Sequence, residues 1–264
     1  MKNLIYFFAS ILLFTSCEEI LDLDLNSMNP KIVIEADLND LSNKQSIHIS
    51  RTVDFDELSS NEPINKASVK VVDRTAGGYY DFIAVGSEGE YICSNFKPKA
   101  GNSYMLYVQI EEDVYTSECV MPAYIPVDSL GISEDEIFGE KKYSVTLKFN
   151  DPANVENFYK YKISVNQNPK FEFAAAFNDK FNDGKFVTHQ LSDQKNSIEL
   201  NDTVTVIRSI IDKSVYKFWN DVQSINPGSA APANPTSNIT NGALGYFSVS
   251  SSKVFGYRIN IKKD

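Results

Sequence analysis

Alternation of apolar and polar side chains runs through most of this 264-residue chain and constrains its fold more than any other feature. Residues 31–38, 46–53, 103–112 and 141–150 are clear examples, because apolar side chains recur at alternate positions along most of each segment. A period of two is that of a strand with one buried face, whereas an amphipathic helix repeats every 3.6 residues. We therefore expect a mainly β protein.

The first half of the chain reads as a series of short strands separated by turn residues. The seven segments are 31–38, 46–53, 67–74, 79–85, 89–96, 103–112 and 113–121. This pattern is typical of an immunoglobulin-like sandwich. We expect that domain over residues 31–124, because Pro122 and Pro126 follow the last strand.

The second half, residues 125–264, predicts a β-rich domain that carries one helix. Strands are expected at 141–150, 157–167 and 203–209, and 243–261 reads as two further β segments. Over 212–225 the apolar residues recur at helical spacing instead; they are Val215, Phe218, Trp219, Val222 and Ile225. Asp212 can cap this helix. The loop that follows, 228–241, is too long for a tight turn and is expected to be functional or mobile.

The N-terminus has the features of an export signal. Lys2 precedes an apolar run that is too short to span a bilayer, and the run ends at Cys17. Residues 13–17 resemble a bacterial lipobox, although Phe14 replaces the usual leucine. We expect a signal peptide over 1–16, a lipidated Cys17 and a tether over 17–30. The alternative is an ordinary secreted protein in which Cys17 is incidental.

Two acidic residues, Glu18 and Glu19, directly follow Cys17. Acidic residues at this position resemble the surface-export signal of Bacteroidota lipoproteins, which places them on the outer face of the outer membrane. The alternative is a solvated acidic tether. We expect a lipid-anchored protein that faces outward.

Four stretches of the chain together resemble one family, the Bacteroidota lipoproteins grouped as domain-of-unknown-function family 4249. The stretches are 17–25 followed by 31–35, then 177–184, 202–206 and 232–247, and the last is the most specific. The resemblance spans nearly the whole mature chain. It implies an outer-membrane lipoprotein, commonly encoded beside a TonB-dependent receptor, without an established activity. It supplies no catalytic residues.

Composition and motifs disfavour nucleic-acid binding and catalysis. The chain has 25 basic and 35 acidic residues, so its net charge of −10 repels a polyanion. A Ser-x-x-Lys pair occurs three times without its companion motifs, and no Gly-x-Ser-x-Gly or His-Glu-x-x-His is present. His48 and His189 are expected to be surface or hydrogen-bonding residues. We therefore expect neither enzymatic activity nor a cofactor.

Three groups of residues are candidates for binding or cross-linking. Asp179, Asn182 and Asp183 form a weak calcium candidate, because hard oxygen ligands cluster before a glycine, although Phe181 cannot serve in an EF-hand loop. The alternative is an exposed turn. The second group is a candidate binding surface of aromatic and amide side chains near turns, namely Tyr79, Tyr80, Asn238, Asn241, Tyr246 and Phe247. Cys93 and Cys119 either form a disulfide or are small buried residues.

Three classes of function follow from these observations. The first is an anchored accessory or binding protein that helps a TonB-dependent receptor to capture nutrient. The second is a structural or adhesive surface protein without a small-molecule site, and the third is a surface hydrolase. We expect the first, because exposed loops on a rigid β-scaffold are the usual place for recognition.

Overall fold

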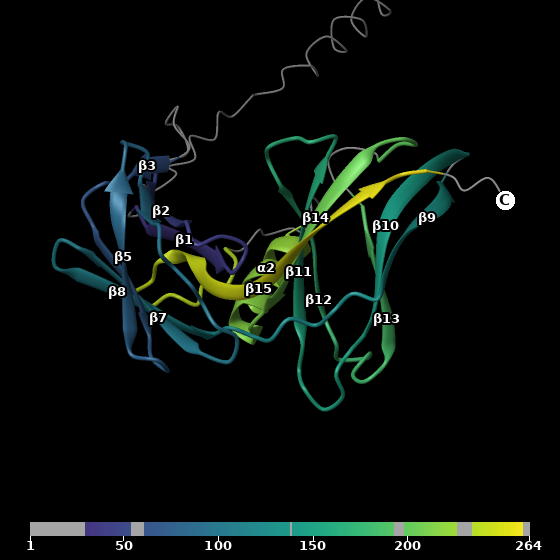
Figure 1. Ribbon diagram of the computed structural model, residues 1–264. Helices are drawn as coiled ribbons and strands as arrows, with labels where there is room; N and C mark the ends of the chain where they lie inside the picture. The colour runs from purple at the N-terminus through teal and green to yellow at the C-terminus, as the bar shows by residue number, and fades with distance from the viewer. Residues whose placement is uncertain (1–29, 54–60, 138, 193–197, 226–233, 261–264) are drawn as a thin grey trace, which may run out of the picture. The chain divides into compact units, whose positions relative to one another are not determined.

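The computed structural model describes residues 30–53, 61–137, 139–192, 198–225 and 234–260, which are mainly β-strand with one helix (Figure 1). The first eight strands are β1 (Ile32–Asn39), β2 (Gln45–Thr52), β3 (Asn61–Pro63), β4 (Ser68–Asp73), β5 (Gly78–Val85), β6 (Glu90–Cys93), β7 (Ser103–Ile110) and β8 (Asp113–Val120). They are followed by β9 (Ser129–Ile137), β10 (Glu140–Asn150), β11 (Phe158–Val165), β12 (Glu172–Asn178), β13 (Phe186–Leu191), β14 (Thr203–Ile211), α2 (Lys213–Ser224) and β15 (Leu244–Arg258). The prediction of a mainly β chain is confirmed, and the immunoglobulin-like arrangement of residues 31–124 stays a prediction.

The described strands form two sheets. The larger has twelve strands, eleven of them in the order β12-β11-β14-β15-β1-β2-β6-β5-β4-β7-β8, while β3 pairs with β2. The smaller has the order β13-β10-β9. Strands of the second half of the chain therefore belong to both sheets, and β15 lies next to β1.

Strand β15 joins the N-terminal and C-terminal strands (Figure 1, yellow). Its residues 244–250 pair in parallel with β1, and its residues 251–258 pair antiparallel with β14. The two β segments expected over 243–261 are thus one strand with two successive partners. At Gly245 a Cβ atom would lie 2.1 Å from the Ile34 carbonyl oxygen, and φ is +89°, so this pairing with β1 requires glycine.

Strand β15 contributes side chains to two large hydrophobic cores. The first is built from β1 to β8 and takes Phe247 and Val249 from β15. The second is built mainly from β10, β11, β13 and β14. The predicted domain boundary at residue 124 falls between most residues of the two cores. Four C-terminal residues nevertheless pack in the first core, namely Ile239, Ala243, Phe247 and Val249.

Helix α2 packs on the larger sheet near its β12 end, where it contacts β12, β11 and β15. It begins after Asp212, whose carboxylate accepts a hydrogen bond from the Val215 amide at 3.0 Å. The predicted range of 212–225 matches the helix with its two caps, Asp212 and Ile225. Val215 is buried, and Phe218 and Trp219 pack beside Tyr246.

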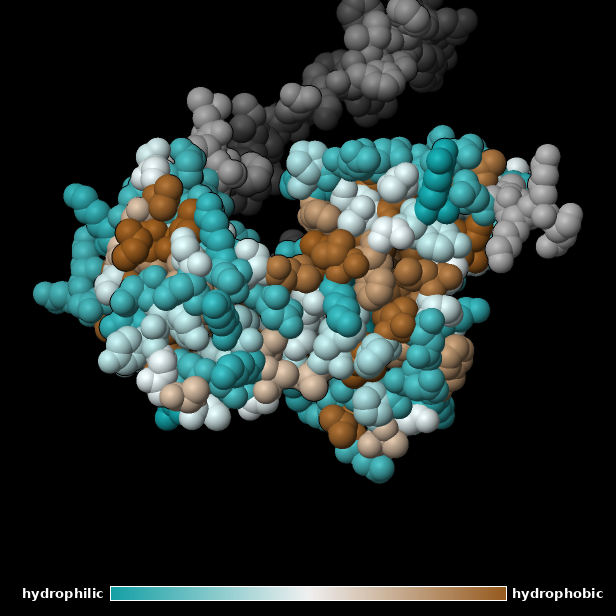
Figure 2. All heavy atoms as spheres, viewed as in Figure 1, coloured by the Kyte–Doolittle hydropathy of each residue, from teal (hydrophilic) through white to brown (hydrophobic). Residues whose placement is uncertain are grey.

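Hydrophilic side chains dominate the face shown in Figure 2, with hydrophobic clusters between them. One cluster lies over β5, the strand that exposes Ile83 and Val85. None of the helices in the described ranges is long and apolar enough to cross a bilayer. The signal peptide and lipidation predicted for residues 1–17, and the tether predicted for 17–30, lie outside the described residues, apart from Pro30.

Candidate functional site

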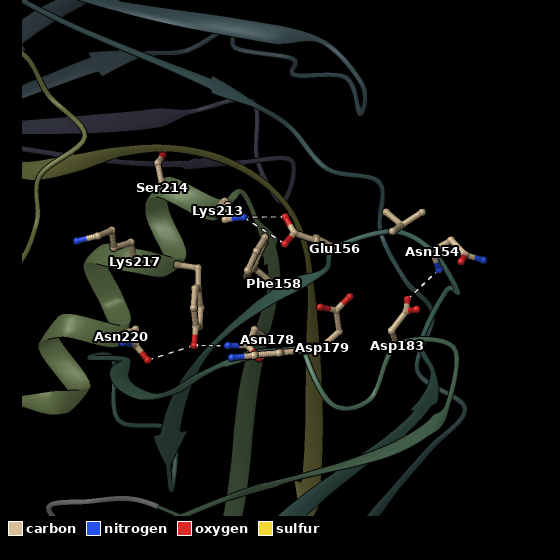
Figure 3. Close-up of a pocket in the computed structure, with 13 residues that line it drawn as sticks. Asn154, Glu156, Phe158, Asn178, Asp179, Asp183, Lys213, Ser214, Lys217 and Asn220 are labelled. Atoms are coloured by element: carbon tan, nitrogen blue, oxygen red, sulfur yellow. Dashed lines mark hydrogen bonds and ion pairs between the residues drawn. The ribbon is translucent and has the colours of Figure 1, made fainter.

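A pocket of about 970 Å³ lies between helix α2 and the loops that follow β10 and β12 (Figure 3). Its wall contains three acidic, three basic and three asparagine side chains, together with the rings of Phe158 and Tyr216. The polar members are Asn154, Glu156, Asn178, Asp179, Lys180, Asp183, Lys213, Ser214, Lys217 and Asn220. This mixture of ring surface and polar groups is typical of a small-molecule site.

Two stacked rings form the apolar part of the wall. Phe158, the first residue of β11, stacks on Tyr216 of α2 with their centroids 5.0 Å apart and an interplanar angle of 28°. Phe158 is buried, whereas Tyr216 is half-buried. The ring of Tyr216 therefore offers the more accessible apolar surface of the pair.

A row of hydrogen bonds fixes the polar part of the wall. The Asn178 side-chain amide donates to the Tyr216 hydroxyl at 2.7 Å, and this hydroxyl donates to Asn220 Oδ1 at 3.1 Å. Asn178 ends β12 and Asn220 lies one helical turn after Tyr216. These amides are therefore held in place before any ligand arrives, which lowers the ordering cost of binding.

Exposed charges surround the opening of the pocket. Lys213 Nζ lies 3.0 Å from Glu156 Oε2, and Lys217 Nζ donates to the Thr236 hydroxyl at 2.5 Å. Lys213 and Glu156 are both mostly exposed, so their ion pair contributes little to stability. Equal numbers of acidic and basic residues line the pocket, which favours a ligand without net charge.

One of the three Ser-x-x-Lys pairs, Ser214 and Lys217, lies in this pocket. The Ser214 hydroxyl donates to Asp212 at 2.7 Å and accepts from the Asn238 amide at 3.0 Å. Lys217 contacts Thr236 and Asp221 instead. The two side chains therefore have structural partners rather than one another.

The structure gathers a different set of residues at the candidate calcium site from the set that the sequence predicted. Asp179 is buried and Asp183 is exposed, and their carboxylates lie close to that of Asp151. Asn182 contributes its backbone to the turn, because its amide donates to the Asp179 carbonyl at 2.6 Å. The acidic group is therefore Asp151, Asp179 and Asp183, and Asp151 was missing from the sequence prediction.

The structure does not gather the predicted aromatic surface. Tyr79 is 70% exposed, while Tyr80 packs edge-on against Phe96 with centroids 4.8 Å apart. Tyr246 and Phe247 are buried, the first beside the helix and the second in the first core. Their rings therefore stabilise the fold and cannot form the expected binding platform.

The two asparagines of the predicted surface stabilise the loop before β15. The Asn238 side chain accepts a hydrogen bond from the Phe247 amide at 2.9 Å and donates to the Phe247 carbonyl at 2.8 Å. Asn241 is exposed in a turn with a φ of +58°. Residues 228–233, the first part of the predicted loop 228–241, lie outside the described residues.

Both candidate disulfide cysteines are buried in the first core as free thiols. Cys93 Sγ lies 3.0 Å from Asn95 Oδ1, and burial raises the pKa of Cys119 well above its usual value. The structure thus places them as small buried residues, which was the alternative to a bridge.

A buried polar network in the second core escaped the sequence analysis. Arg208 of β14 is fully buried, donates through Nε to the Tyr161 hydroxyl at 3.1 Å and through Nη1 to the Ile125 carbonyl. His189 of β13 forms a 2.8 Å hydrogen bond to the same tyrosine hydroxyl and stacks on Phe177. Burial and the nearby arginine lower the pKa of His189 to about 3, so this histidine is neutral at pH 7.

A second network lies beneath helix α2. Asp37 of β1 accepts from Lys160 at 2.5 Å and from Lys162 at 2.6 Å, both on β11. Burial alone raises the pKa of Asp37, but the two lysines outweigh it and hold the pKa below its usual value. Burial lowers the pKa of Lys160 to about 8. These residues link β1 to β11, two strands that β14 and β15 separate in the larger sheet.

The fold and site define a mainly β protein with a polar pocket against its one described helix. The chain belongs to the family described as domain of unknown function DUF4249, whose model matches residues 18–255. No curated protein matches the chain.

Proposed function

We propose that this protein is a lipid-anchored binding protein of the outer membrane, that it faces the cell exterior, and that it captures a polar nutrient for a TonB-dependent receptor. The observation that carries the proposal is the pocket between helix α2 and the loops after β10 and β12, which we call the α2 pocket. Its volume of about 970 Å³ falls within the usual range for small-molecule sites. A structural or adhesive protein has no need of such a pocket.

The chemistry of the pocket favours a neutral polar ligand with one apolar face, for which a short saccharide is the best match. The half-buried ring of Tyr216 offers an apolar surface to a sugar ring. Asn178 and Asn220 supply amide groups beside it, and the balanced charges repel neither a hydroxyl-rich nor a zwitterionic molecule.

The anchoring part of the proposal depends on the sequence of the N-terminus. Cys17 ends a lipobox-like stretch, and it stands directly before the 18–255 family match. Two or more acyl chains hold a protein stably at a membrane, whereas one does so only marginally. Glu18 and Glu19 support an outward-facing position.

Calorimetric titration with a panel of mono- to tetrasaccharides and di- to tetrapeptides tests the binding activity. The diagnostic variant is Tyr216→Phe, which keeps the ring but removes the hydroxyl that joins Asn178 to Asn220. Since one hydrogen bond is worth about 0.5–1.5 kcal/mol, we expect affinity to fall by about 2- to 10-fold. Tyr107→Phe, at an exposed tyrosine of β7, is the matched control and retains full affinity.

Binding of no member of the panel contradicts the proposal and favours a structural protein. Equal affinity of wild type and Tyr216→Phe places the ligand elsewhere and contradicts the pocket assignment. Chemical conversion of a panel member in the calorimeter favours the surface hydrolase instead.

A further inference from the structure

Three aspartates from two loops meet at the edge of the α2 pocket. Asp151 follows β10, whereas Asp179 and Asp183 follow β12, and one carboxylate oxygen of each lies within 4.8 Å of the others. Figure 3 shows the carboxylates of Asp179 and Asp183 directed toward the segment 154–156. Asp151 lies 28 positions before Asp179 and 32 positions before Asp183, so the fold brings distant parts of the chain together here.

Backbone contacts fix the two loops against one another. The Asn157 amide donates to Asp179 Oδ2 at 2.7 Å, and the Asn154 amide donates to Asp183 Oδ1 at 2.8 Å. A Cβ atom at Gly184 would lie 2.8 Å from Ala153 Cβ, so the loops are packed as closely as glycine allows. The carboxylates are thus positioned by the fold itself.

Asp151 leaves one buried oxygen unsatisfied. Its side chain accepts a hydrogen bond from the Tyr159 hydroxyl through Oδ1, while Oδ2 is buried without a hydrogen-bond partner. Asp151 is 5% exposed and Asp179 is 6% exposed. A buried oxygen of this kind is costly unless a donor or a cation reaches it.

The electrostatics of the group also call for a cation. The three carboxyl groups each place an oxygen within 4.8 Å of the others, so negative charge is concentrated at one point. Among the ion pairs of the described residues, none joins these three aspartates to a lysine or arginine. Like charges held together in this way are stabilised by a bound cation.

We propose that Asp151, Asp179 and Asp183 bind one Ca²⁺ ion. Calcium takes oxygen ligands at about 2.3–2.6 Å, so two ligands on opposite sides of the ion are separated by roughly 5 Å. The carboxylate spacing of at most 4.8 Å agrees with that limit. Mg²⁺ requires ligands at about 2.0–2.1 Å and a stricter geometry, and Zn²⁺ prefers nitrogen and sulfur ligands, which this group lacks.

The bound ion links the loops after β10 and β12, which both form part of the pocket wall. Ca²⁺ therefore stabilises the folded state and holds that wall in one position. This inference does not depend on the identity of the pocket ligand, because it concerns the carboxylates alone.

The full chain, purified in detergent and stripped with EGTA, is titrated with CaCl₂ by calorimetry, and its thermal unfolding is followed with and without the ion. We expect one Ca²⁺ per chain and a higher Tm. At a free concentration of about 100 times Kd, the ion shifts the folding equilibrium about 100-fold. Asp183→Asn reduces the affinity at least 10-fold, and Asp151→Asn abolishes binding.

Asp183 is exposed, and asparagine can still accept from the Asn154 amide, so Asp183→Asn keeps the test valid even if Asp151→Asn does not fold. Asp81→Asn, an exposed change on β5, is the control and binds as wild type does. The proposal is overturned if wild type shows neither heat nor a Tm shift, or if Asp183→Asn titrates like wild type. Tighter binding of Mg²⁺ than of Ca²⁺ overturns the choice of ion.

The saccharide panel is run both in EGTA and in Ca²⁺, which separates this inference from the proposed function. Calcium binding without saccharide binding supports the metal site and contradicts the pocket proposal. Saccharide binding in EGTA, with no response to calcium, supports the pocket proposal and contradicts the metal site.

Discussion

Replacement of His189 by glutamine tests the buried network of the second core through its effect on pH dependence. His189 is 5% exposed and hydrogen bonded to Tyr161, which itself accepts from Arg208. Its pKa is lowered to about 3 in the folded protein, against an ordinary value of 6.5 for histidine. The folded state therefore binds fewer protons than the unfolded state between these two values.

The sign and size of the effect follow from proton linkage. Because the unfolded state takes up the additional proton, the free energy of unfolding falls as pH falls below about 6.5. With the two pKa values above, the loss between pH 7.5 and pH 5.5 is about 1.4 kcal/mol. His189→Gln removes this contribution, since glutamine does not titrate.

Urea unfolding of both proteins in the same buffers at pH 7.5, 6.5 and 5.5 measures the difference. Carboxylates that titrate at the lower end affect both proteins, so they cancel in the comparison. We expect wild type to lose about 1.4 kcal/mol more than the variant over this interval. Equal slopes for the two proteins refute the assignment of His189 as a buried neutral histidine.

Two further predictions concern the joins between the N-terminal and C-terminal strands. Gly245→Ala places a Cβ atom 2.1 Å from the Ile34 carbonyl oxygen at a φ of +89°, so we expect destabilisation of more than about 2 kcal/mol in thermal unfolding. Gly256→Ala in the same strand is the control, because its Cβ atom would meet nothing within 4 Å, and its stability is expected to stay within about 1 kcal/mol of wild type. Similar losses of stability for both variants contradict the pairing of β15 with β1. Asp37→Asn leaves the buried Lys160 without its carboxylate, so we expect a loss of about 3–5 kcal/mol in urea unfolding. The exposed ion pair of Asp81 and Lys70 is the reference, because Asp81→Asn is expected to lower stability by at most about 1 kcal/mol. A similarly small loss for Asp37→Asn argues against a buried ion pair.

The sequence pattern predicted the strands that bury only one face. It missed the polar residues that are buried on strands covered on both faces. Strand β7 alternates between buried and less buried residues as expected, so its period of two was visible. Strands β11 and β14 are covered on both sides, and they bury Lys160 and Arg208, which a sequence pattern assigns to the surface. Their burial follows from neighbours that lie far away in the chain, and no local pattern reports it.

Strand β9 was missed because it lies at the edge of the smaller sheet and carries three consecutive acidic residues, 134–136. Strand β13 follows the phenylalanine- and asparagine-rich stretch 171–186, in which turn residues obscure the alternation. The two segments expected over 243–261 are one strand, β15, which pairs first with β1 and then with β14. The sequence did not reveal this, because a change of pairing partner within a strand leaves no mark in its residue pattern.

The candidate site was only partly accessible to sequence reasoning. Asp179 and Asp183 are close in the chain, so their cluster was visible, whereas Asp151 joins them only through the packing of two loops. The pocket combines residues 154–158, 178–183 and 213–220, which the order of strands in the sheet brings together. Tyr246 and Phe247 were misread because glycine neighbours suggested exposed turns, while the parallel pairing with β1 buries both rings.

Affinity purification of the lipidated protein from membranes tests the central claim most directly, with Cys17→Ser as its matched variant. We predict that wild type fractionates with the outer membrane and co-purifies with a TonB-dependent receptor, whereas Cys17→Ser leaves the membrane fraction and recovers less receptor. Recovery of lipids and abundant bystanders alone contradicts the receptor partnership. Retention of Cys17→Ser at the membrane to the same extent as wild type contradicts the lipid anchor.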